Sequence, residues 1–179
     1  MKVVFLDVDG VLNTSKTFER VYYSFKNTGK KELEIDSFRL EYLRQIIDET
    51  DSKLVLSSTW RRFFEKVDNK VVPRSEKGKQ FYDMLSNYNI EIYDILSFDN
   101  DINREGLIID WLSKNEVETF IIIDDEPSLF NILLDNLIQT SKVKNNQILT
   151  NMDDCFGLCE PHIEKAKEML NIKVKVKKQ

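Results

Sequence analysis

The sequence predicts an α/β fold: a doubly wound, Rossmann-like parallel sheet of about five strands that is covered by helices. Three short apolar runs predict the sheet, at Val3–Leu6, Leu54–Leu56 and Phe120–Ile123. They do not alternate with polar residues, as is typical of strands that are buried on both faces of a parallel sheet. Segments with helical spacing of apolar residues separate these runs, and the repeated order of strand, helix and strand is typical of this fold class.

Two weaker apolar segments complete the predicted sheet. Ile90–Leu96 and Gln147–Leu149 are interpreted as the fourth and fifth strands. The segment 13–35 interrupts the order of strand and helix, because it is aromatic and charged without a clean period. It is either a flap over a functional site, forming a small cap, or a surface insertion that is packed by its own aromatic side chains.

Four helices are predicted from apolar residues that recur on one face. Asp36 is the predicted N-cap of the first helix, and Pro127 suits the first turn of the third. The second follows Arg104, and the fourth extends from about Pro161 to Leu170. The apolar faces of the first three comprise Leu40, Leu43, Ile46 and Ile47; Leu107, Ile108, Trp111 and Leu112; and Phe130, Leu133, Leu134 and Leu137.

The length of the chain suits one domain. It has 179 residues, of which 41% are hydrophobic, and domains commonly contain about 100 to 200 residues. We expect this domain over residues 1–170, followed by a basic tail over 171–179. The tail is interpreted first as a frayed solubilising segment and second as a contact for a phosphate backbone.

Charge and cysteine content disfavour several function classes. A net charge of -5 is not the electrostatic signature of a protein that binds duplex nucleic acid, although it leaves a local basic patch open. Two cysteines do not make a disulfide framework, so we expect no disulfide partner and a reducing, cytoplasmic location. No segment resembles a signal peptide or an apolar run of about 18 residues, so no membrane partner is expected.

Each of the three strong apolar runs ends in residues that can carry chemistry. Asp7–Gly10 follows the first run, Ser57–Thr59 the second and Asp124–Glu126 the third. In an open parallel sheet, ligands bind beyond the carboxyl ends of the strands, at the switch point of strand order. We therefore expect the three polar clusters to converge.

Convergence of Asp7, Asp9, Asp124 and Asp125 would be unfavourable without a cation. Two carboxylates about 5 Å apart repel by about 3 kcal/mol at an effective dielectric constant of about 20. Because the available ligands are almost all oxygens, Mg²⁺ fits better than zinc. The four aspartates are therefore candidate ligands of a Mg²⁺ cofactor. A second role stays open for Asp125, which could instead cap the helix predicted near Pro127.

The spacing of Asp7 and Asp9 supports a catalytic role for both. Two residues apart at a strand end, they can point the same way while Val8 faces the core. One carboxylate could then attack phosphorus and form an aspartyl-phosphate, an established use of a carboxylate nucleophile, while the other transfers a proton. Gly10 would let the backbone turn sharply and approach the phosphate of the substrate closely.

The order of these motifs resembles the haloacid dehalogenase-like (HAD) superfamily over most of the chain. This resemblance implies that Asp7 is nucleophile and metal ligand, and that Asp9 is general acid and base and binds the metal through its main-chain carbonyl. It implies that Ser57 hydrogen-bonds the phosphoryl group and that Arg104 steadies the nucleophile and the phosphate. Asp124, in the acidic last motif, would complete the metal site.

A closer likeness is to the phosphatase domain of Swiss Army Knife RNA repair proteins, which implies removal of a phosphate from a nucleic-acid end or a nucleotide. The superfamily also contains many small-molecule phosphatases, so a sugar or metabolite phosphate stays open as the substrate. The segments that carry the closer likeness are Asp7–Asn13, Ser58–Arg61, Trp111–Leu112, Ile123–Asp125 and Gly157–Leu158.

Two of the predicted site residues have competitors. Ser58 competes with Ser57 for the phosphate, since a serine at a strand end can simply bond backbone groups. Lys77 or Lys79 could take the place of Arg104, which is also compatible with an ordinary surface arginine in a first helical turn.

Trp60, Arg61 and Arg62 follow the predicted phosphate site and could hold a base and a phosphate of the substrate. In the alternative interpretation, Trp60 packs in the core and the two arginines are solvated. Both interpretations stay open from the sequence.

Cys155, Cys159 and His162 are the soft ligands of the chain apart from its methionines. Three ligands at this spacing do not match a usual structural zinc pattern, which needs four. We therefore predict no zinc site there, and no catalytic role for the single histidine.

Together these observations predict a Mg²⁺-dependent phosphomonoesterase. A dehalogenase on the same fold is disfavoured by Asp9, because dehalogenases of the superfamily lack the second aspartate. A receiver-type phospho-acceptor module is disfavoured by motif order, since receivers carry their acidic pair early and the phosphorylated aspartate after a middle strand. Here the candidate nucleophile follows the first strand, and the acidic pair comes late.

Overall fold

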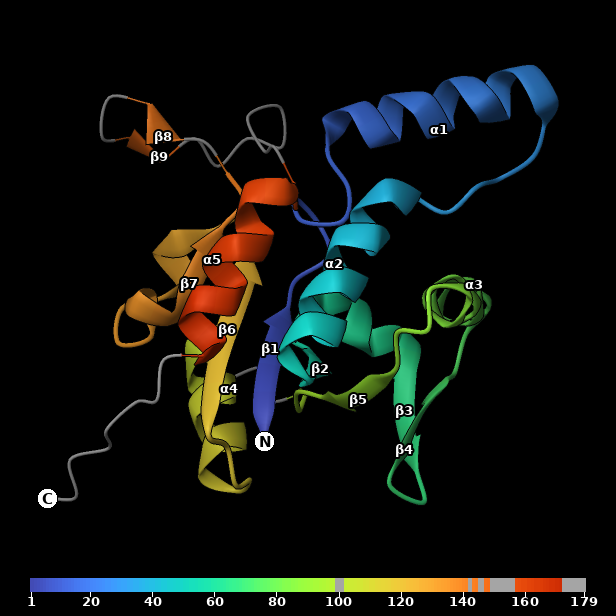
Figure 1. Cartoon of the computed structure of the whole chain (residues 1–179). Coiled ribbons are helices and arrows are strands. Elements are labelled where there is room, and N and C mark those ends of the chain that lie inside the picture. Colours follow the sequence, from blue (N-terminus) through green and yellow to red (C-terminus); the bar gives the residue numbers. More distant parts are fainter. Residues whose placement is uncertain (99–101, 142, 145–146, 149–156, 172–179) are drawn as a thin grey trace, which may run out of the picture.

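The computed structural model describes residues 1–98, 102–141, 143–144, 147–148 and 157–171. Its central sheet contains β1 (Lys2–Leu6), β2 (Ser52–Leu56), β5 (Ile92–Ile95), β6 (Thr119–Asp124) and β7 (Leu137–Gln139). The spatial order is β5-β2-β1-β6-β7, and every neighbouring pair is parallel (Figure 1). This arrangement confirms the predicted α/β fold with a doubly wound parallel sheet.

Helices cover both faces of the sheet. Alternate strand residues point to opposite sides, so the apolar strands contribute to a hydrophobic core on each face. Leu6 of β1 belongs to one hydrophobic core and its neighbour Phe5 to the other. The first core is completed by α2 (Ser37–Thr50), α3 (Glu76–Asn87) and α5 (Glu160–Asn171), and the second by α4 (Arg104–Ser113). No helix in the described part of the chain is both long and apolar enough to cross a membrane.

Three of the four predicted helices are confirmed as α2, α4 and α5. Asp36 occupies the N-cap position of α2, as expected. The helix predicted at Pro127 is wrong: the chain forms two short 3-10 helices there, η2 (Pro127–Leu129) and η3 (Leu134–Asn136), and then enters β7.

A buried glutamate explains why the predicted helix does not form. The carboxylate of Glu105 accepts hydrogen bonds from the backbone N–H groups of Asn131 and Leu133, each 2.8 Å long. Those N–H groups are therefore not available for helical hydrogen bonds. Phe130 and Leu133 are buried as predicted, whereas Leu134 is 49% exposed.

The fourth predicted strand is confirmed as β5. The fifth is confirmed as a strand over Gln147–Ile148, but its predicted place in the central sheet is wrong. Residues Gln147–Ile148 form β9, which pairs antiparallel with β8 (Val143–Lys144) in a separate two-stranded sheet. The fifth position in the central sheet is taken by β7, which pairs with β6. The remainder of the predicted strand, Leu149, and the basic tail beyond Asn171 lie outside the described residues.

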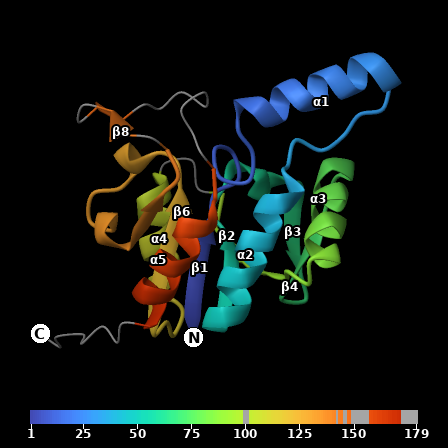
Figure 2. The same cartoon turned by 45° about the horizontal axis from the view of Figure 1, so that its top comes forward.

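Most of the segment 13–35 is a helix, α1 (Ser15–Thr28), which lies beyond the carboxyl ends of the strands in both views (Figures 1 and 2). Only Thr17 and Val21 of this helix are buried. Thr17 donates a hydrogen bond to Asp36 at 2.7 Å, which ties α1 to the start of α2. Its action as a flap stays a prediction.

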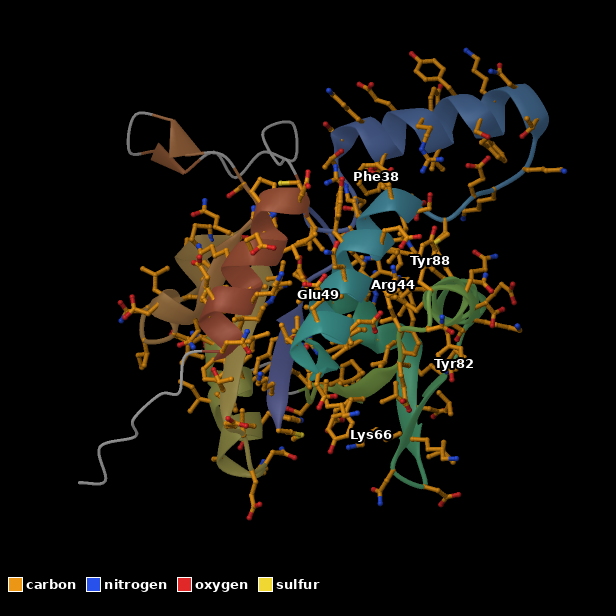
Figure 3. All side chains as sticks on the ribbon, viewed as in Figure 1. Phe38, Arg44, Glu49, Lys66, Tyr82 and Tyr88 are labelled. Carbon is orange, nitrogen blue, oxygen red and sulfur yellow. The ribbon has the colours of Figure 1, made fainter. Side chains whose placement is uncertain are left out.

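A β-hairpin between β2 and β5 was not predicted from the sequence. The 3-10 helix η1 (Thr59–Phe63) leads into β3 (Phe64–Val67) and β4 (Lys70–Pro73), which pair antiparallel. Lys66 on β3 (Figure 3) forms a 2.9 Å ion pair with Asp94 of β5, and Asp94 also accepts a 2.9 Å hydrogen bond from Trp111. This carboxylate therefore joins the hairpin to the sheet and to α4.

Candidate active site

The three predicted polar clusters converge at the carboxyl ends of β2, β1 and β6, which are neighbours in the sheet. The backbone N–H of Asp7 donates to the carbonyl of Ile123 at 2.9 Å, and that of Ser57 donates to the carbonyl of Leu6 at 3.0 Å. These bonds continue the parallel ladders by one residue. They fix Asp7 between Ser57 on one side and Asp124 on the other.

Three carboxylates gather at this point. Asp7, Asp124 and Asp125 each offer an oxygen that lies within 4.8 Å of the other two. Asp7 and Asp124 are buried, and Asp125 is half-buried. Arg104, at the start of α4, contacts Asp7 at 3.1 Å and also pairs with Asp124. One guanidinium charge offsets only part of three carboxylate charges.

Burial makes the uncompensated charge costly. It raises the pKa of Asp7 to about 8; Arg104 opposes this effect, and Asp124 and Asp125 add to it. Burial likewise raises the pKa of Asp124, again against Arg104. Burial acts to lower the pKa of Arg104, but Asp7 and Asp124 outweigh it and raise that pKa. Within this geometry Asp7 needs further positive charge to be ionised near neutral pH.

The donor set fits a hard divalent cation. Its side-chain ligands are all carboxylate oxygens, which are the ligands that Mg²⁺ prefers. Asp7, Asp124 and Asp125 are the predicted ligands that the structure brings together. The side chain of Asp9 is not one of this group, so its predicted metal contact rests on its main-chain carbonyl.

The Asp9 side chain is held by two donors. Its Oδ1 accepts from Asn13 Nδ2 at 2.9 Å, and its Oδ2 accepts from Trp60 Nε1 at 3.0 Å. Asn13 Oδ1 also accepts from the backbone N–H of Gly10 at 2.9 Å. Asn13 is therefore a positioning residue that was not predicted, although it closes the run Asp7–Asn13 on which the closer likeness rests.

Gly10 has the left-handed conformation that the turn after β1 requires, with φ at 75°. A Cβ at this position would collide with the side chain of Asp125. We expect Gly10→Ala to displace Asp125 and to lower the phosphatase activity that the sequence predicts by at least about tenfold, because small displacements of positioned groups cost rate steeply. Steady-state kinetics with added Mg²⁺ measure this effect.

Gly29 offers a matched control for Gly10. Its φ is 70°, but a Cβ there meets nothing within 4 Å. Gly29→Ala should therefore show only the cost of the left-handed backbone, about 1 to 2 kcal/mol of unfolding free energy, with turnover kept. Equal turnover in Gly10→Ala and Gly29→Ala would contradict the proposal that the missing Cβ of Gly10 is needed to keep Asp125 in place.

Ser57 and Ser58 differ in their hydrogen bonding. The hydroxyl of Ser58 accepts from the backbone N–H of Trp60 at 3.3 Å and so caps η1. The hydroxyl of Ser57 is buried and has no hydrogen-bond partner within the described part of the chain. Of the two serines, Ser57 therefore has the free hydrogen-bonding capacity.

Trp60 lies in the core rather than on the surface. It is 4% exposed, and its ring makes edge contacts with Phe63 and Phe81 at centroid distances of 5.9 and 5.1 Å. Because the residue is almost fully buried, its ring has no open face for a base, which favours the interpretation that it packs in the core. Its indole N–H reaches the site through Asp9.

Arg61 is half-buried beside the site. Its Nη1 donates to the carbonyls of Ser57 and Ser58, both at 3.0 Å, and its Nε donates to the carbonyl of Ser97 at 3.2 Å. Burial lowers the pKa of Arg61, and so does the nearby Arg104, whereas Asp7 opposes them. Arg61 is thus close enough to interact electrostatically with Asp7 of the acidic cluster.

The two alternative basic residues lie elsewhere. Lys77 pairs with Glu34 at 2.9 Å and lies 4.2 Å from the centroid of the Trp60 ring. Lys79 pairs with Asp83 at 2.7 Å on the exposed face of α3. Of the three basic residues that the sequence left open, Arg104 is the one in contact with Asp7.

Cys159 and His162 lie together near the start of α5, with 3.4 Å between Sγ and Nδ1. Burial raises the pKa of the Cys159 thiol, which disfavours a reactive thiolate. Cys155 lies outside the described residues. Within the described residues, the acidic cluster is the group of three or more potential ligands that the structure brings together.

Comparison with protein families gives one assignment. Residues 3–145 match the family model described as the HAD domain in Swiss Army Knife RNA repair proteins. Searches of curated proteins and of solved structures give no match. The matched residues include β1, β2 and β6, whose carboxyl ends form the site.

Proposed function

This chain belongs to the family of HAD domains found in Swiss Army Knife RNA repair proteins, and we propose that it is a Mg²⁺-dependent phosphomonoesterase. Phosphatase-type chemistry is what the family indicates. The finer proposal is that the reaction passes through an aspartyl-phosphate on Asp7 and that the phosphate comes from a nucleotide or from a nucleic-acid end.

The buried Ser57 hydroxyl is the observation that carries the proposal. Burying a hydroxyl without a partner costs about 1 to 3 kcal/mol, so a protein that keeps one there usually uses it. Ser57 follows the strand next to Asp7, and no residue in the described part of the chain bonds its hydroxyl. A phosphoryl oxygen of the substrate would be a suitable acceptor.

The residues around Asp7 support an in-line displacement. Asp7 attacks phosphorus, and the bond to the leaving oxygen breaks. Asp9 protonates that oxygen and later takes a proton from the water that hydrolyses the aspartyl-phosphate. Each Asp9 oxygen accepts one hydrogen bond, from Asn13 or Trp60, and keeps a second lone pair for this proton.

Charge on the transferring group would be balanced by a bound cation and by Arg104. Asp7, Asp124 and the main-chain carbonyl of Asp9 would hold Mg²⁺, with Asp125 as a further ligand. When bound, the cation supplies electrostatic stabilisation of the phosphoryl oxygens. Arg104 already contacts Asp7 and Asp124 and would hold the nucleophile in line.

Ser57→Ala tests the role of the Ser57 hydroxyl. We expect kcat/KM to fall about 10 to 100-fold, since a hydrogen bond to a charged group contributes about 1.5 to 3 kcal/mol. The free energy of unfolding should stay constant or rise, because no hydrogen bond within the described structure is lost. Enzyme kinetics and urea denaturation measure the two quantities.

Ser58→Ala is the matched control for Ser57→Ala, because it removes a hydroxyl that caps η1. It should lower the unfolding free energy by about 1 kcal/mol and change kcat/KM less than Ser57→Ala does. A stability loss in Ser57→Ala that equals the loss in Ser58→Ala would contradict the proposed role of Ser57.

The substrate class is tested by phosphate release with Mg²⁺ present. The panel comprises mononucleotides, sugar phosphates and oligonucleotides that carry a 5′ or a 3′ phosphate. We expect the highest kcat/KM on nucleotides or oligonucleotides. A strong preference for sugar phosphates would overturn this part of the proposal and leave a metabolite phosphatase of the same fold.

A further inference from the structure

Phe98, three residues after the end of β5, is an exposed aromatic residue beside the candidate active site. Its residue surface is 48% exposed, and it lies at the end of the described segment 1–98. The guanidinium carbon of Arg61 is 5.5 Å from the centroid of its ring, and that of Arg74 is 6.0 Å away. The exposed part of this ring is a surface on which a base can stack, and the two arginines lie close enough to contact an anion beside it.

Arg61 connects this aromatic residue to the phosphate site. The same guanidinium that lies near Phe98 donates hydrogen bonds to the carbonyls of Ser57 and Ser97. It also interacts electrostatically with Asp7. The Arg61 side chain thus lies between the ring of Phe98 and the backbone of Ser57.

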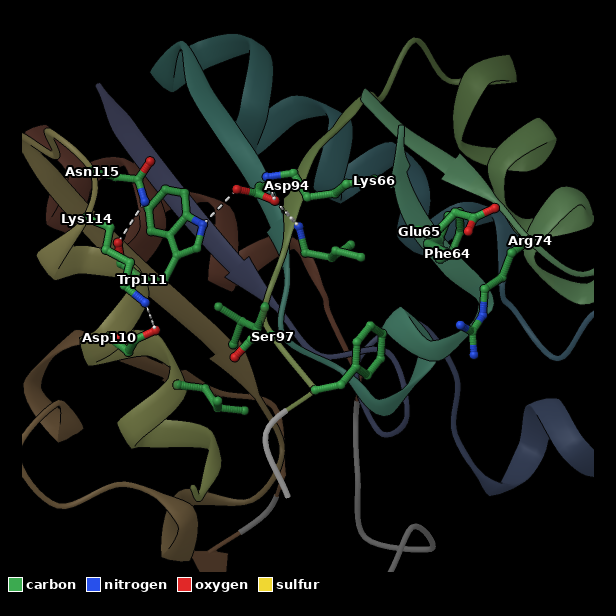
Figure 4. A pocket seen from close by; sticks show the side chains of 14 residues that line it. Phe64, Glu65, Lys66, Arg74, Asp94, Ser97, Asp110, Trp111, Lys114 and Asn115 are labelled. Carbon is green, nitrogen blue, oxygen red and sulfur yellow. Dashed lines mark hydrogen bonds and ion pairs between the residues drawn. The ribbon is translucent and has the colours of Figure 1, made fainter. Parts of the chain in front are cut away.

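A cavity of about 560 Å³ opens next to Phe98, between the β3–β4 hairpin and α4 (Figure 4). In Figure 4, Trp111 and Lys114 of α4 lie on one side and Arg74 on the other. Ser97, whose carbonyl accepts the hydrogen bond from Arg61 Nε, also lines the cavity. The volume falls in the range of small-molecule sites, about 300 to 1,000 Å³, so there is room for a base beside the ring.

The cavity is lined by three basic and three acidic side chains, and two of the basic ones are paired with acids: Lys66 with Asp94 and Lys114 with Asp110. The segment that leads into the cavity is basic. Residues 61–79, which contain most of η1, the hairpin and the start of α3, include seven Lys and Arg against three Asp and Glu, a net charge of +4. The whole chain has a net charge of -5. Of this basic segment, Arg61 lies beside the active site and Arg74 lines the cavity, where they would attract a phosphodiester backbone.

We infer that Phe98 is the stacking platform for a base of a single-stranded nucleic-acid end, and that Arg74 contacts the neighbouring backbone phosphate. This inference rests on the proposed function, because the terminal phosphate of the same strand would occupy the Asp7 site. Trp60, the aromatic residue that the sequence offered for this role, is covered by Phe63 and Phe81. A sugar phosphate would leave the exposed ring and Arg74 unused.

The experiment compares two substrates on Phe98→Ala, Phe98→Trp and a control variant. One substrate is a short single-stranded oligonucleotide with a terminal phosphate; the other is glycerol phosphate, which has no base. Tyr93→Ala is the control, since Tyr93 is a 42% exposed aromatic residue of β5, five residues before Phe98. The readout is the ratio of kcat/KM on the oligonucleotide to that on glycerol phosphate.

Phe98→Ala is expected to lower this ratio about 10 to 100-fold, because base stacking on an aromatic side chain contributes about 1 to 3 kcal/mol. The loss should appear mainly in KM, and Phe98→Trp should keep the ratio within about threefold of the unmodified protein. Tyr93→Ala should leave it unchanged. An unchanged ratio in Phe98→Ala, or a ratio lowered as much by Tyr93→Ala, would overturn the stacking role.

Binding without turnover separates this inference from the proposed function. Fluorescence anisotropy with the same oligonucleotide, labelled at its other end, gives Kd even for a protein that releases no phosphate. Phe98→Ala should raise Kd about 10 to 100-fold, and Arg74→Gln should reduce the slope of log K against log salt by about 0.7. If the protein releases no phosphate but binds the oligonucleotide in a way that depends on Phe98, the proposed phosphatase function is refuted and the stacking role is kept. If Phe98→Ala leaves Kd unchanged, the stacking role of Phe98 is refuted.

Discussion

Asp7→Asn is expected to lower the rate of phosphate-ester hydrolysis by at least about 10⁴-fold, a loss comparable to removal of other covalent nucleophiles. The amide of Asn is not a competent nucleophile, and it is a poorer ligand for a hard cation than a carboxylate. Phosphate release with saturating Mg²⁺ and glycerol phosphate measures the rate. Asp135→Asn, at an exposed aspartate in η3, controls for the substitution itself.

The same variant should fold, and its stability should show why the site needs a cation. Burial raises the pKa of Asp7 to about 8 from an ordinary value of 3.8, so the metal-free native state binds more protons than the unfolded state between these values. The unfolding free energy of the metal-free protein therefore falls as pH rises from about 4 to 8. Because the amide of Asn does not titrate, Asp7→Asn removes the part of this pH-dependent loss of stability that comes from Asp7.

Thermal unfolding in EDTA at several pH values is the measurement. The unmodified protein should lose stability between about pH 4 and 8 relative to Asp7→Asn, and added Mg²⁺ should stabilise the unmodified protein more than the variant. Near-normal turnover in Asp7→Asn would refute the nucleophile assignment. Equal stabilisation of both proteins by Mg²⁺ would refute Asp7 as a ligand.

The site was largely predictable because the residues that form it follow buried strands. Val3–Leu6, Leu54–Leu56 and Phe120–Ile123 are apolar without alternation, which is typical of central parallel strands. Once the three runs are neighbouring strands, the residues after them must meet at one edge. The meeting of Asp7, Ser57 and Asp124 is therefore a consequence of local pattern and fold class together.

The features that were missed depend on tertiary contacts. The helix predicted at Pro127 has a valid helical stripe, but a carboxylate on α4, Glu105, takes the N–H groups of Asn131 and Leu133. Nothing in the local sequence reveals that competition. Phe98 comes close to Arg61 of η1 because β5 pairs with β2, and strand order is not readable from a single strand.

Asp9→Asn is expected to lower the hydrolysis of an alkyl phosphate by about 10² to 10⁴-fold, the usual range for a general acid and base. The variant keeps the shape of the side chain and a contact with Asn13. It removes the proton that an alkoxide leaving group needs and the base that activates water. Trp60→Phe, which deletes the 3.0 Å hydrogen bond to Asp9 but keeps an aromatic ring in the core, should show a smaller loss, about tenfold.

The leaving group determines which step Asp9→Asn slows. p-Nitrophenolate departs without protonation, so Asp7 should still be phosphorylated by p-nitrophenyl phosphate, while hydrolysis of the aspartyl-phosphate lacks its base. Rapid mixing of Asp9→Asn with p-nitrophenyl phosphate should then give a burst of about one p-nitrophenolate per protein chain, followed by slow turnover. Glycerol phosphate should give no burst of released glycerol. A variant without the burst, slow on both substrates from the first turnover, would show that Asp9 positions the nucleophile rather than transferring the proton. Unchanged turnover in Asp9→Asn would mean that Asp9 is not the general acid and base. The presence of Asp9 would then no longer favour a phosphatase over a dehalogenase.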